Sequence, residues 1–305
     1  MDEPRIYLNG RFLPESSAGI SLSDAGLVQG TTVAEQLRTF GGNLFHLRDH
    51  LARLEHSLDI VGVNPGLGWE QLAELALELV EHNHRLLAAG DDLGLSIFIT
   101  PGEYPAYSTQ SRTEPTVCLH TYPLPFRLWA GKYRSGQVLR TTEIRQVPPE
   151  CWPPELKCRS RMHYYLADRL AGMAEPGARA LMLDHEGWVT EASTANILLY
   201  RPEEGFVSPP ASKVLQGISL AMTCELAGQL GISTAHRDLT VAEVASADEV
   251  LLTSTPLCLL PVSRLNGHPI GRGRPGELFG RLADAWSDSV GVDIVAQAEK
   301  FAQRR

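Results

Sequence analysis

The sequence predicts a two-domain protein of mixed α/β class, in which a smaller N-terminal α+β domain precedes a larger C-terminal domain of strands with flanking helices. The 305 residues, 43% of them hydrophobic, suffice for roughly two domains with sizeable cores. Strand-like and helix-like apolar patterns occur in both halves, and the proline-rich passage QVPPECWPPELK separates them. We therefore expect an N-terminal domain over 1–124, a connection over 125–156 and a C-terminal domain over 157–305.

The N-terminal half begins with strand signals. IYLNGRFLP is typical of two strands joined by an Asn-Gly turn. VAEQLRTF and NLFHL form a second expected pair, joined by Gly41 and Gly42. Apolar residues then recur at helical spacing from Leu47 to Leu58, and a second helix is expected over 69–89. LGLSIFIT and TVCLHTYPL complete the domain as β-rich runs.

The prolines of 125–156 remove backbone donors and disfavour a helix or a central strand, so this segment is interpreted as a connection. After it, Met162, Leu166, Leu170 and Met173 recur at helical spacing. Short strands are expected at ARALMLD, WVTE and ANILLYR, followed by a helix that begins near LQGIS. DEVLLTST and LCLLPV are expected as buried strands, and ELFGRLADAWSDSVG as a C-terminal helix.

Composition argues against several classes of partner. The formal net charge is −9 and no basic run contains interleaved aromatic residues, so nucleic acid is not expected. No apolar run approaches the roughly 18 residues of a membrane span, and the N-terminus lacks a basic segment followed by an apolar one, so no membrane association is expected. The five cysteines are irregularly spaced, with no CxxC or HExxH motif. We expect reduced thiols, a cytoplasmic location and no bound metal.

Lysine is unusually scarce in this chain. There are four lysines against 23 arginines, and Lys157 is the only one between Lys132 and Lys213. The other three are expected at the surface. A lysine can lose its proton when it is buried or near another cation, whereas arginine stays charged. Further along the chain, Glu191 lies in the strand-like stretch LMLDHEGWVTEASTANILLY. A lysine that can form an imine and a strand-borne carboxylate are what a pyridoxal phosphate enzyme needs.

Four separated motifs carry a family resemblance. They are DAGLVQGTTVAEQLRTFGGNLFHLRDHLARLEHS at 24–57, LKCRSRMHYYLADRLA at 156–171, VTEASTAN at 189–196, and the pair LQGIS at 215–219 and TST at 253–255. In order and spacing they resemble the fold-type IV pyridoxal phosphate enzymes, which include branched-chain aminotransferases, D-amino acid aminotransferases and 4-amino-4-deoxychorismate lyases. The resemblance runs from about Ile6 to Val262.

The resemblance implies a role for each matching residue. Lys157 takes the position of the catalytic lysine that bonds the cofactor and shuttles the α-proton. Arg53 takes the position of the arginine that grips the phosphate, and Glu191 that of the carboxylate facing the pyridine nitrogen. Arg53 and Lys157, taken singly, would be interpreted as solvated surface charges. The other cofactor-binding positions implied are Asn196, Gly217, Ile218, Ser219 and Thr255, with the backbone N–H groups of Ile218 and Ser219 at a helix N-terminus.

Several positions depart from the best-known members. Met162 stands where branched-chain aminotransferases have a tyrosine, and helical geometry turns Tyr164 and Tyr165 to other faces. Pro101 replaces the arginine that binds the substrate carboxylate in D-amino acid aminotransferases. Pro256 has no backbone N–H to offer a substrate.

Two further positions concern the substrate. Ala34 replaces a bulky aromatic residue, which indicates a roomier pocket than a branched-chain one. Arg38 aligns with an arginine of the branched-chain group and could bind a carboxylate, although a solvent-facing strand arginine is the simpler interpretation. Arg38 and Pro256 are therefore the candidate substrate-side residues.

The resemblance implies a homodimer that holds pyridoxal 5'-phosphate between its two domains, with a loop over 102–113 lent by the partner subunit. The expected activity is an aminotransferase, branched-chain-like with an altered pocket, that acts on amino acid and keto acid substrates. A lyase that eliminates pyruvate from 4-amino-4-deoxychorismate stays open, because LDHEGWVTE and the surroundings of Arg161 resemble those enzymes. A relative that keeps only the cofactor or the shape for binding is a third possibility, disfavoured by the joint presence of Lys157, Glu191 and Arg53.

Overall fold

The computed structural model describes residues 3–108 and 114–304, and the chain divides into two compact units. The first unit comprises Met1–Leu124 and Leu156–Ser160, and the second comprises Pro125–Glu155 and Arg161–Arg305. The expected connection over 125–156 thus falls almost wholly in the second unit, and Lys157 in the first. Part of the expected partner-lent loop over 102–113, namely 109–113, lies outside the described residues.

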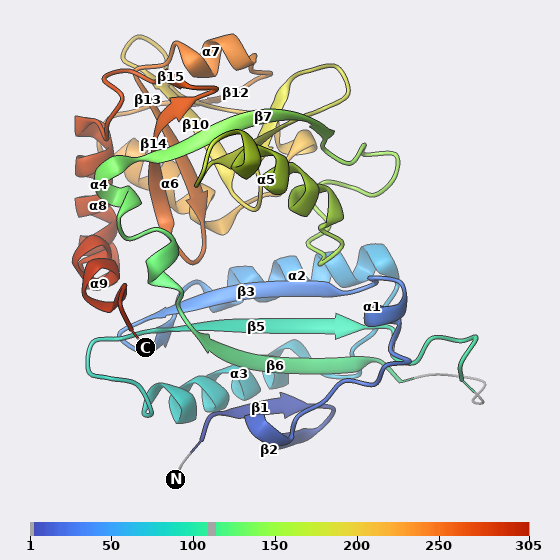
Figure 1. The fold of residues 1–305 in the computed structure, drawn as a ribbon. Helices are drawn as coiled ribbons and strands as arrows, with labels where there is room; N and C mark the ends of the chain where they lie inside the picture. The colour runs from blue at the N-terminus through green and yellow to red at the C-terminus, as the bar shows by residue number, and fades with distance from the viewer. Residues whose placement is uncertain (1–2, 109–113, 305) are drawn as a thin grey trace. The chain divides into compact units, whose positions relative to one another are not determined.

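A six-stranded antiparallel sheet forms the first unit, in the order β2-β1-β6-β5-β3-β4 (Figure 1). The expected hairpin is confirmed, because Asn9 and Gly10 both have positive φ, as a tight two-residue turn requires. The strands are β1 (Arg5–Leu8), β2 (Arg11–Pro14), β3 (Val33–Phe40), β4 (Asn43–Leu44), β5 (Leu93–Thr100) and β6 (Thr116–Pro123).

Two long helices cover one face of this sheet, and their apolar stripes form its core (Figure 1). Helix α2 (Leu47–Val61) follows the leucine spacing expected from the sequence, and α3 (Trp69–His84) ends five residues before the expected position. Leu37, Leu54 and Leu95 are fully buried between the helices and the sheet. The short helix α1 (Ala25–Val28) and the 3-10 turn η1 (Glu15–Ser17) lie in the connections.

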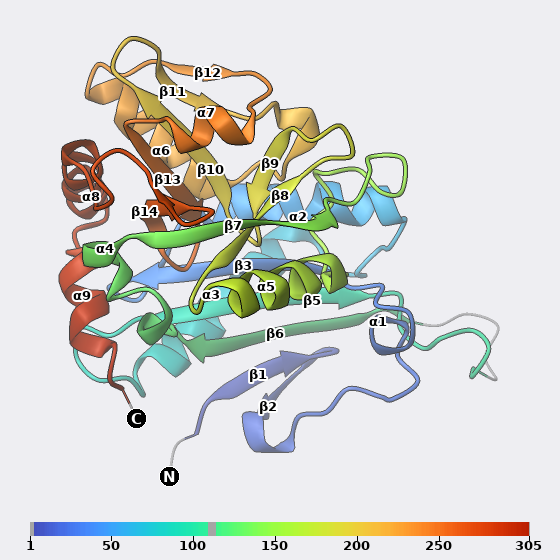
Figure 2. The same cartoon turned by 45° about the horizontal axis from the view of Figure 1, so that its top comes forward.

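The second unit is built on a nine-stranded mixed sheet, strongly twisted in Figure 2. The order is β12-β11-β10-β13-β14-β7-β8-β9, with β15 paired to β14. The strands are β7 (Gln137–Arg145), β8 (Arg179–Leu183), β9 (Val189–Ala192), β10 (Asn196–Arg201), β11 (Gly205–Ser208), β12 (Thr234–His236), β13 (Glu249–Ser254), β14 (Cys258–Leu265) and β15 (His268–Pro269).

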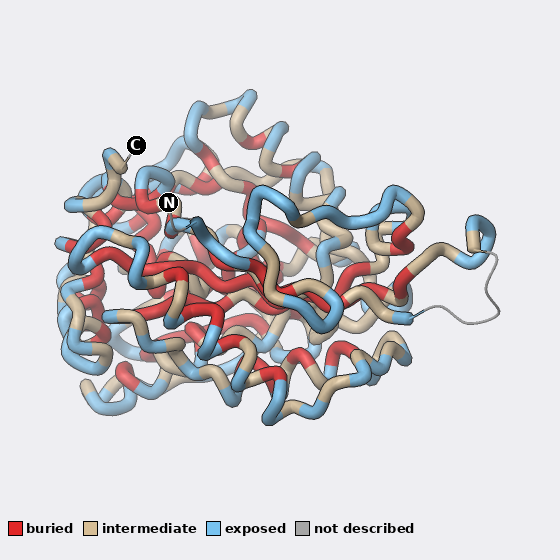
Figure 3. The backbone as a smooth tube through the Cα atoms, turned by 90° about the horizontal axis from the view of Figure 1, so that it is seen from below, coloured by how far each residue is buried: buried red, intermediate tan, exposed pale blue. Residues whose placement is uncertain are grey.

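Helices lie on both faces of this sheet. Helix α5 (Met162–Ala174) packs on β7 and β8, whereas α6 (Ile218–Gln229) and α8 (Glu277–Val290) pack together over β13 and β14 (Figure 2). The remaining elements are α4 (Lys132–Ser135), α7 (Val241–Ala245), α9 (Ile294–Phe301) and the 3-10 turns η2 (Phe126–Leu128) and η3 (Ala211–Lys213). Buried residues concentrate along the strands of each unit and exposed residues in the loops (Figure 3).

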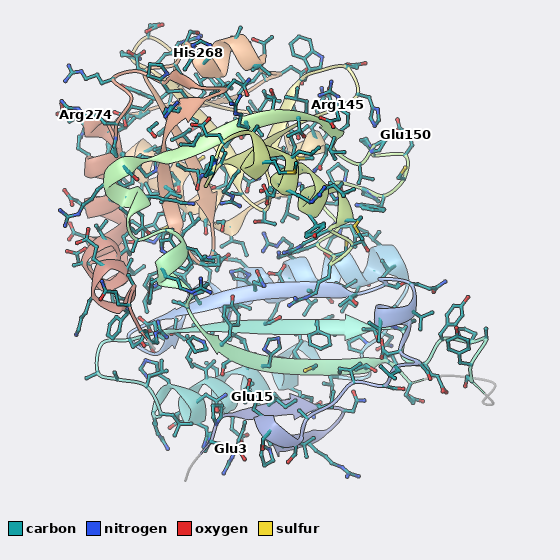
Figure 4. The ribbon with its side chains drawn as sticks, in the orientation of Figure 1. Glu3, Glu15, Arg145, Glu150, His268 and Arg274 are labelled. Carbon is teal, nitrogen blue, oxygen red and sulfur yellow. The ribbon has the colours of Figure 1, made fainter. Side chains whose placement is uncertain are left out.

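The interpretation of 125–156 as a connection without a central strand was wrong for its middle part. Strand β7 lies there, in parallel ladders with both β14 and β8. The prolines of the segment lie outside this strand, Pro125 before it and the other four in the loop after it, so they leave the ladder donors of β7 intact. Figure 4 shows Arg145 at the end of β7 and Glu150 in the loop that follows.

Helix α5 forms where expected but buries a different face. Met162 and Met173 are 69% and 70% exposed in this chain, whereas Ala167 and Ala171 are buried. Small residues let the helix approach the sheet closely. This close packing decides the buried face of α5, and the spacing of the larger apolar residues does not. No helix within 3–108 and 114–304 has the length and hydropathy needed to cross a bilayer.

Candidate active site

Lys157 is held in the first unit by a short antiparallel pairing with β3. The Ala34 N–H donates to the Lys157 carbonyl at 3.0 Å, and the Arg159 N–H donates to the Thr32 carbonyl at 2.9 Å, on either side of a bridge between Val33 and Cys158. Lys157 therefore stands directly opposite Ala34, and paired residues of an antiparallel ladder project to the same face. The face that carries Ala34 is opposite the one covered by α2 and α3, since Val33 and Leu37 belong to the core beneath those helices.

The other lysines occupy different surroundings. Lys213 is ion-paired to Asp184 at 2.9 Å and to Asp238 at 2.7 Å. Burial alone would lower the pKa of Lys213, but hydrogen bonds to both carboxylates outweigh it and raise the pKa. The Lys132 ammonium donates to the Gln137 amide oxygen, and burial lowers the pKa of Lys132. Lys132 and Lys213 are half-buried and Lys300 is exposed, so the expectation of three surface lysines is wrong for the first two.

A buried charge cluster lies behind Lys157, where Glu35 of β3 meets helix α2. Glu35 is fully buried. It accepts hydrogen bonds from Arg53 through Nε at 2.7 Å and Nη2 at 2.9 Å, and its Oε2 lies 2.7 Å from Nδ1 of the buried His50. The fork of the guanidinium matches the two carboxylate oxygens, which makes this a strong ion pair. Arg53 is thereby fixed in direction, with one edge of its guanidinium on Glu35.

The protonation states of this cluster follow from its contacts. Burial alone would raise the pKa of Glu35, but the Arg53 charge and hydrogen bonds from Arg53 and His50 lower it to about 2. Burial lowers the pKa of His50, so the imidazole is neutral and its Nδ1–H donates to Glu35. His50 Nε2 is buried with no hydrogen-bond partner in the described part of the chain. The Lys157 charge also contributes to lowering the pKa of both groups, which places Lys157 near this cluster.

Glu191 of β9 is held in the second unit by two neutral donors. It is 4% exposed, and its Oε1 accepts a hydrogen bond from the Tyr164 hydroxyl and another from Gln146 Nε2 at 2.9 Å. Burial and the neighbouring Glu191 raise the pKa of Tyr164 well above its usual value, so this phenol keeps its proton and donates. Both of these donors are neutral groups.

The start of helix α6 offers backbone donors. Gly217 precedes the helix in an extended conformation, and no side chain caps this end. The N–H groups of Ile218 and Ser219 lie in the first turn, where a helix has unsatisfied donors and a favourable dipole for anions. Asn196 fixes this turn, because its Nδ2 donates to the Leu215 carbonyl at 2.8 Å.

The backbone at Gly217 passes so close to Asn196 that a side chain would not fit. A Cβ on Gly217 would lie 2.0 Å from Asn196 Oδ1. Asn196 pairs with Thr253 of β13, whose Oγ1 is buried without a hydrogen-bond partner within the described residues. Thr255 and Pro256 follow in the turn between β13 and β14. The second unit thus brings together Asn196, the α6 N-terminus and the end of β13.

The substrate-side candidates are placed as follows. Arg38 is almost fully buried, with its guanidinium 4.0 Å from the centre of the Phe40 ring and Nε donating to the Thr39 carbonyl at 3.3 Å. Its interpretation as a solvent-facing residue was therefore wrong. Ala34 is 1% exposed, beside Lys157. Met162 is exposed, whereas Tyr164, expected to point elsewhere, contacts Glu191.

Sequence reasoning missed Glu35, His50, Gln146 and the contact made by Tyr164. A signal for Glu35 was available in the sequence. Val33, Glu35 and Leu37 are alternate residues of β3 and so face the same buried side, where a carboxylate needs a partner. Nothing local marks Gln146, which reaches Glu191 only because β7 lies beside β8 in the sheet.

Comparison with known proteins gives a consistent picture. A family model described as amino-transferase class IV matches residues 32–265. A putative branched-chain-amino-acid aminotransferase of Methanocaldococcus jannaschii is 27% identical over 285 residues, covering 93% of this chain and 96% of that protein. A D-alanine aminotransferase of Bacillus licheniformis is 26% identical, covering 94% of this chain and 97% of that protein.

Solved structures agree in fold. The T.th. branched-chain amino acid aminotransferase with pyridoxamine 5'-phosphate superposes with a TM-score of 0.84 at 25% identity, covering 95% of each chain. The branched-chain aminotransferase of Escherichia coli superposes with a TM-score of 0.86 at 22% identity, covering 94% of each chain, and shows the fold. The resemblance inferred from the four motifs and the expected fold class are both confirmed.

The cluster around Glu35 makes stability depend on pH. Because the pKa of Glu35 is about 2 in the folded protein against an ordinary 4.5, its ionised form contributes stability above about pH 4.5, which is lost as pH falls toward 2. That difference corresponds to roughly 3 kcal/mol. Denaturant unfolding from pH 7 to pH 3 should show the gap between wild type and Glu35→Gln narrowing as pH falls. The exposed Glu78→Gln should track wild type, and a gap that stays constant with pH would contradict the assignment.

Proposed function

The chain belongs to the class IV aminotransferase family, and from that membership we propose that it transfers an amino group between an amino acid and a 2-keto acid using pyridoxal 5'-phosphate. The observation that carries the proposal is Glu191, a buried carboxylate within VTEASTAN that is bound by two neutral donors. A carboxylate at this position is suited to hold a proton on a pyridine nitrogen.

The residues present fit the cofactor's three functional parts. Its phosphate would be held by the N–H groups of Ile218 and Ser219, with Thr255 and the Arg53 guanidinium. Two observations support this: α6 begins without a side-chain cap, and at Gly217 even a Cβ would collide with Asn196. When bound, pyridoxal phosphate supplies an aldehyde that takes up the amino group and a ring that withdraws electrons from the α-carbon.

Lys157 would perform the proton transfers. Its Nζ would hold the cofactor through the aldehyde and, as a free amine, would take up and return the α-proton of the substrate. The backbone bonds to Ala34 and Thr32 fix where its side chain starts.

Tyr164 and Gln146 would position Glu191. The two hydrogen bonds end on the same oxygen and so fix the carboxylate plane. Both donors are neutral, so these two hydrogen bonds would orient the carboxylate toward the ring nitrogen. Asn196 would act indirectly, by holding the turn before α6.

The proposed substrates are amino acids and keto acids in a pocket that differs from a branched-chain one. Ala34 and Pro256 support this difference, since one is small and the other lacks an N–H. We further propose a cytoplasmic homodimer, which the family resemblance supports. The exposed Met162, Tyr165 and Met173 on α5 agree with an apolar surface that a second chain could cover.

Lys157→Ala should remove the covalent link. After loading with cofactor and reduction with borohydride, peptide mass spectrometry should find the adduct on Lys157 in wild type and nowhere in the variant, with turnover abolished. Lys300→Ala, on the exposed part of α9, should keep both adduct and activity. An adduct on another lysine of the wild-type protein would defeat the assignment.

Tyr164→Phe should weaken the hold on Glu191 without unfolding helix α5. A hydrogen bond to a charged group contributes about 1.5–3 kcal/mol, so turnover should fall roughly tenfold or more. The nitrogen-15 resonance of the ring in labelled cofactor should shift as well. Tyr165→Phe, next in sequence but 65% exposed, is the matched control and should leave both unchanged. The same behaviour in the two variants would argue against the role of Tyr164.

Transfer and elimination can be separated directly. We expect that protein given 4-amino-4-deoxychorismate without a keto acid forms no pyruvate, and that an amino acid with 2-oxoglutarate exchanges the amino group. The lyase alternative is motivated by LDHEGWVTE, which contains Glu191. Rapid pyruvate release in the absence of an acceptor would establish the lyase instead.

A further inference from the structure

We propose that a pocket in the second unit binds a small organic cation, and that Gln146 couples the occupancy of this pocket to Glu191. None of the residues that line the pocket is assigned to binding the cofactor. The binding goes beyond the proposed function, whereas the coupling rests on it, because Glu191 is the carboxylate assigned to the cofactor ring. The pocket encloses about 280 Å³. That volume is near the lower end for ligand sites in proteins, so the occupant is a small molecule.

The walls of this pocket are held in place by the protein itself. They come from the loop 146–154 after β7, the turn 184–186 between β8 and β9, Thr190 of β9 and Lys213 of η3. The Gln146 N–H donates to the Leu183 carbonyl at 2.9 Å, which ties the start of the loop to β8. The Cys151 N–H donates to the Pro148 carbonyl at 2.9 Å, which closes the loop on itself. Little ordering of the chain is then needed for a ligand to bind.

One side of the pocket is apolar. It is formed by Val147, Pro148, Pro149 and Pro154. The three prolines have a fixed φ and no backbone N–H to offer, so this side is rigid and suits a hydrocarbon group. Thr190 adds little polarity, because its hydroxyl already donates to the Met182 carbonyl at 3.2 Å. The body of the ligand is therefore apolar.

The charged side chains of the pocket favour a cation. They are three carboxylates and one ammonium, those of Glu150, Asp184, Glu186 and Lys213. The Lys213 ammonium is ion-paired to Asp184 at 2.9 Å and, outside the lining, to Asp238 at 2.7 Å. Two carboxylates therefore already match this ammonium. The charge that remains in the pocket is that of Glu150 and Glu186, and it is negative.

The two remaining carboxylates suit an organic cation. Glu150 and Glu186 come from separate segments and are both exposed, and neither side chain forms an ion pair within residues 3–108 and 114–304. The exposed His185 also lines the pocket. No group of three or more His, Cys, Asp or Glu side chains in that part of the chain is arranged to hold a metal ion. Because these side chains do not converge on one point, they suit a cation whose charge is spread over a larger group.

Gln146 connects the pocket to Glu191. It lines the pocket, and its Nε2 donates to Glu191 Oε1 at 2.9 Å and to the Tyr164 hydroxyl at 3.1 Å. Its own Oε1 is buried with no hydrogen-bond partner among the described residues. A buried acceptor of this kind is costly to leave unsatisfied, so a ligand with N–H donors is favoured. The ligand class is therefore an alkylguanidinium or alkylammonium ion, which would hold the amide that bonds Glu191.

The test titrates the full-length protein, loaded with pyridoxal phosphate, with butylguanidinium at pH 8. This ion has no amino group on a saturated carbon, so it cannot be an amino donor. Butylurea has the same shape without the charge and is the matched control ligand. The variants are the double substitution Glu150→Gln and Glu186→Gln and, as a control outside the pocket, the exposed Glu203→Gln.

Calorimetry should show saturable binding of butylguanidinium and weaker binding of butylurea. The double variant should raise the Kd of butylguanidinium by roughly two- to tenfold, because each exposed carboxylate contributes a modest attraction. Glu203→Gln should leave that Kd unchanged. Added salt should weaken the binding of butylguanidinium and leave that of butylurea unchanged.

Two nuclear magnetic resonance signals locate the ligand and test the coupling. The indole N–H resonance of Trp188, whose ring centre lies 5.9 Å from Lys213 Nζ, should move on titration, and that of Trp286 in α8 should not. The nitrogen-15 resonance of the ring in labelled cofactor should also move, because Gln146 holds Glu191.

Equal affinity for butylurea, an unchanged Kd in the double variant or an unmoved Trp188 resonance would overturn the site. A cofactor resonance that stays fixed while that of Trp188 moves would overturn the coupling to Glu191. A wild-type protein without cofactor absorbance would overturn the proposed function, and calorimetry would still decide whether the pocket binds the cation. Thermal melts check folding. If the double variant does not melt cooperatively, Glu186→Gln alone replaces it, with a smaller expected rise, and an unchanged Kd there would also count against the site.

Discussion

Two backbone hydrogen bonds, from Ala34 to Lys157 and from Arg159 to Thr32, are the constraint on which the proposed chemistry depends. They tie the segment 156–160 to β3 although the residues on either side of it belong to the second unit. Backbone pairing fixes both the position of a side chain and the face of the sheet to which it points. A lysine on an unpaired loop would have neither constraint. Because the pairing is antiparallel and the segment extended, one short ladder orients two cations toward the same face.

The two units handle a buried carboxylate in different ways. Glu35 is neutralised by Arg53 and supported by a neutral His50, so its role is to fix the arginine and the adjoining strand. Glu191 accepts hydrogen bonds from a phenol and an amide, which orient it. The cost of burying a charge is met by an ion pair in the first case. In the second, neutral hydrogen bonds contribute to satisfying the buried carboxylate.

The elements that could be predicted from sequence were those set by local rules. The Asn9-Gly10 hairpin follows from turn geometry, and α2 from the spacing of its leucines. The four motifs were sufficient to indicate the family. Strand β7 was not predicted, because 125–156 was interpreted as one proline-rich segment. The strand and the prolines occupy different parts of that segment. The buried face of α5 was missed because packing against β7 and β8 favours alanines over larger apolar residues. The contacts of Gln146 and Arg159 depend on which strands are neighbours, and no local pattern encodes that.

The small side chain at position 34 limits which substitutions this part of the first unit tolerates. The backbone of Arg159 is level with Thr32, and its Nη2 donates to Oγ of Ser96, opposite Gln36, at 2.6 Å. Its side chain therefore crosses the row of Ala34, where an aromatic residue would compete with it for the same volume. Substitutions at these sites are therefore epistatic: a lineage could enlarge residue 34 only after residue 159 had been shortened.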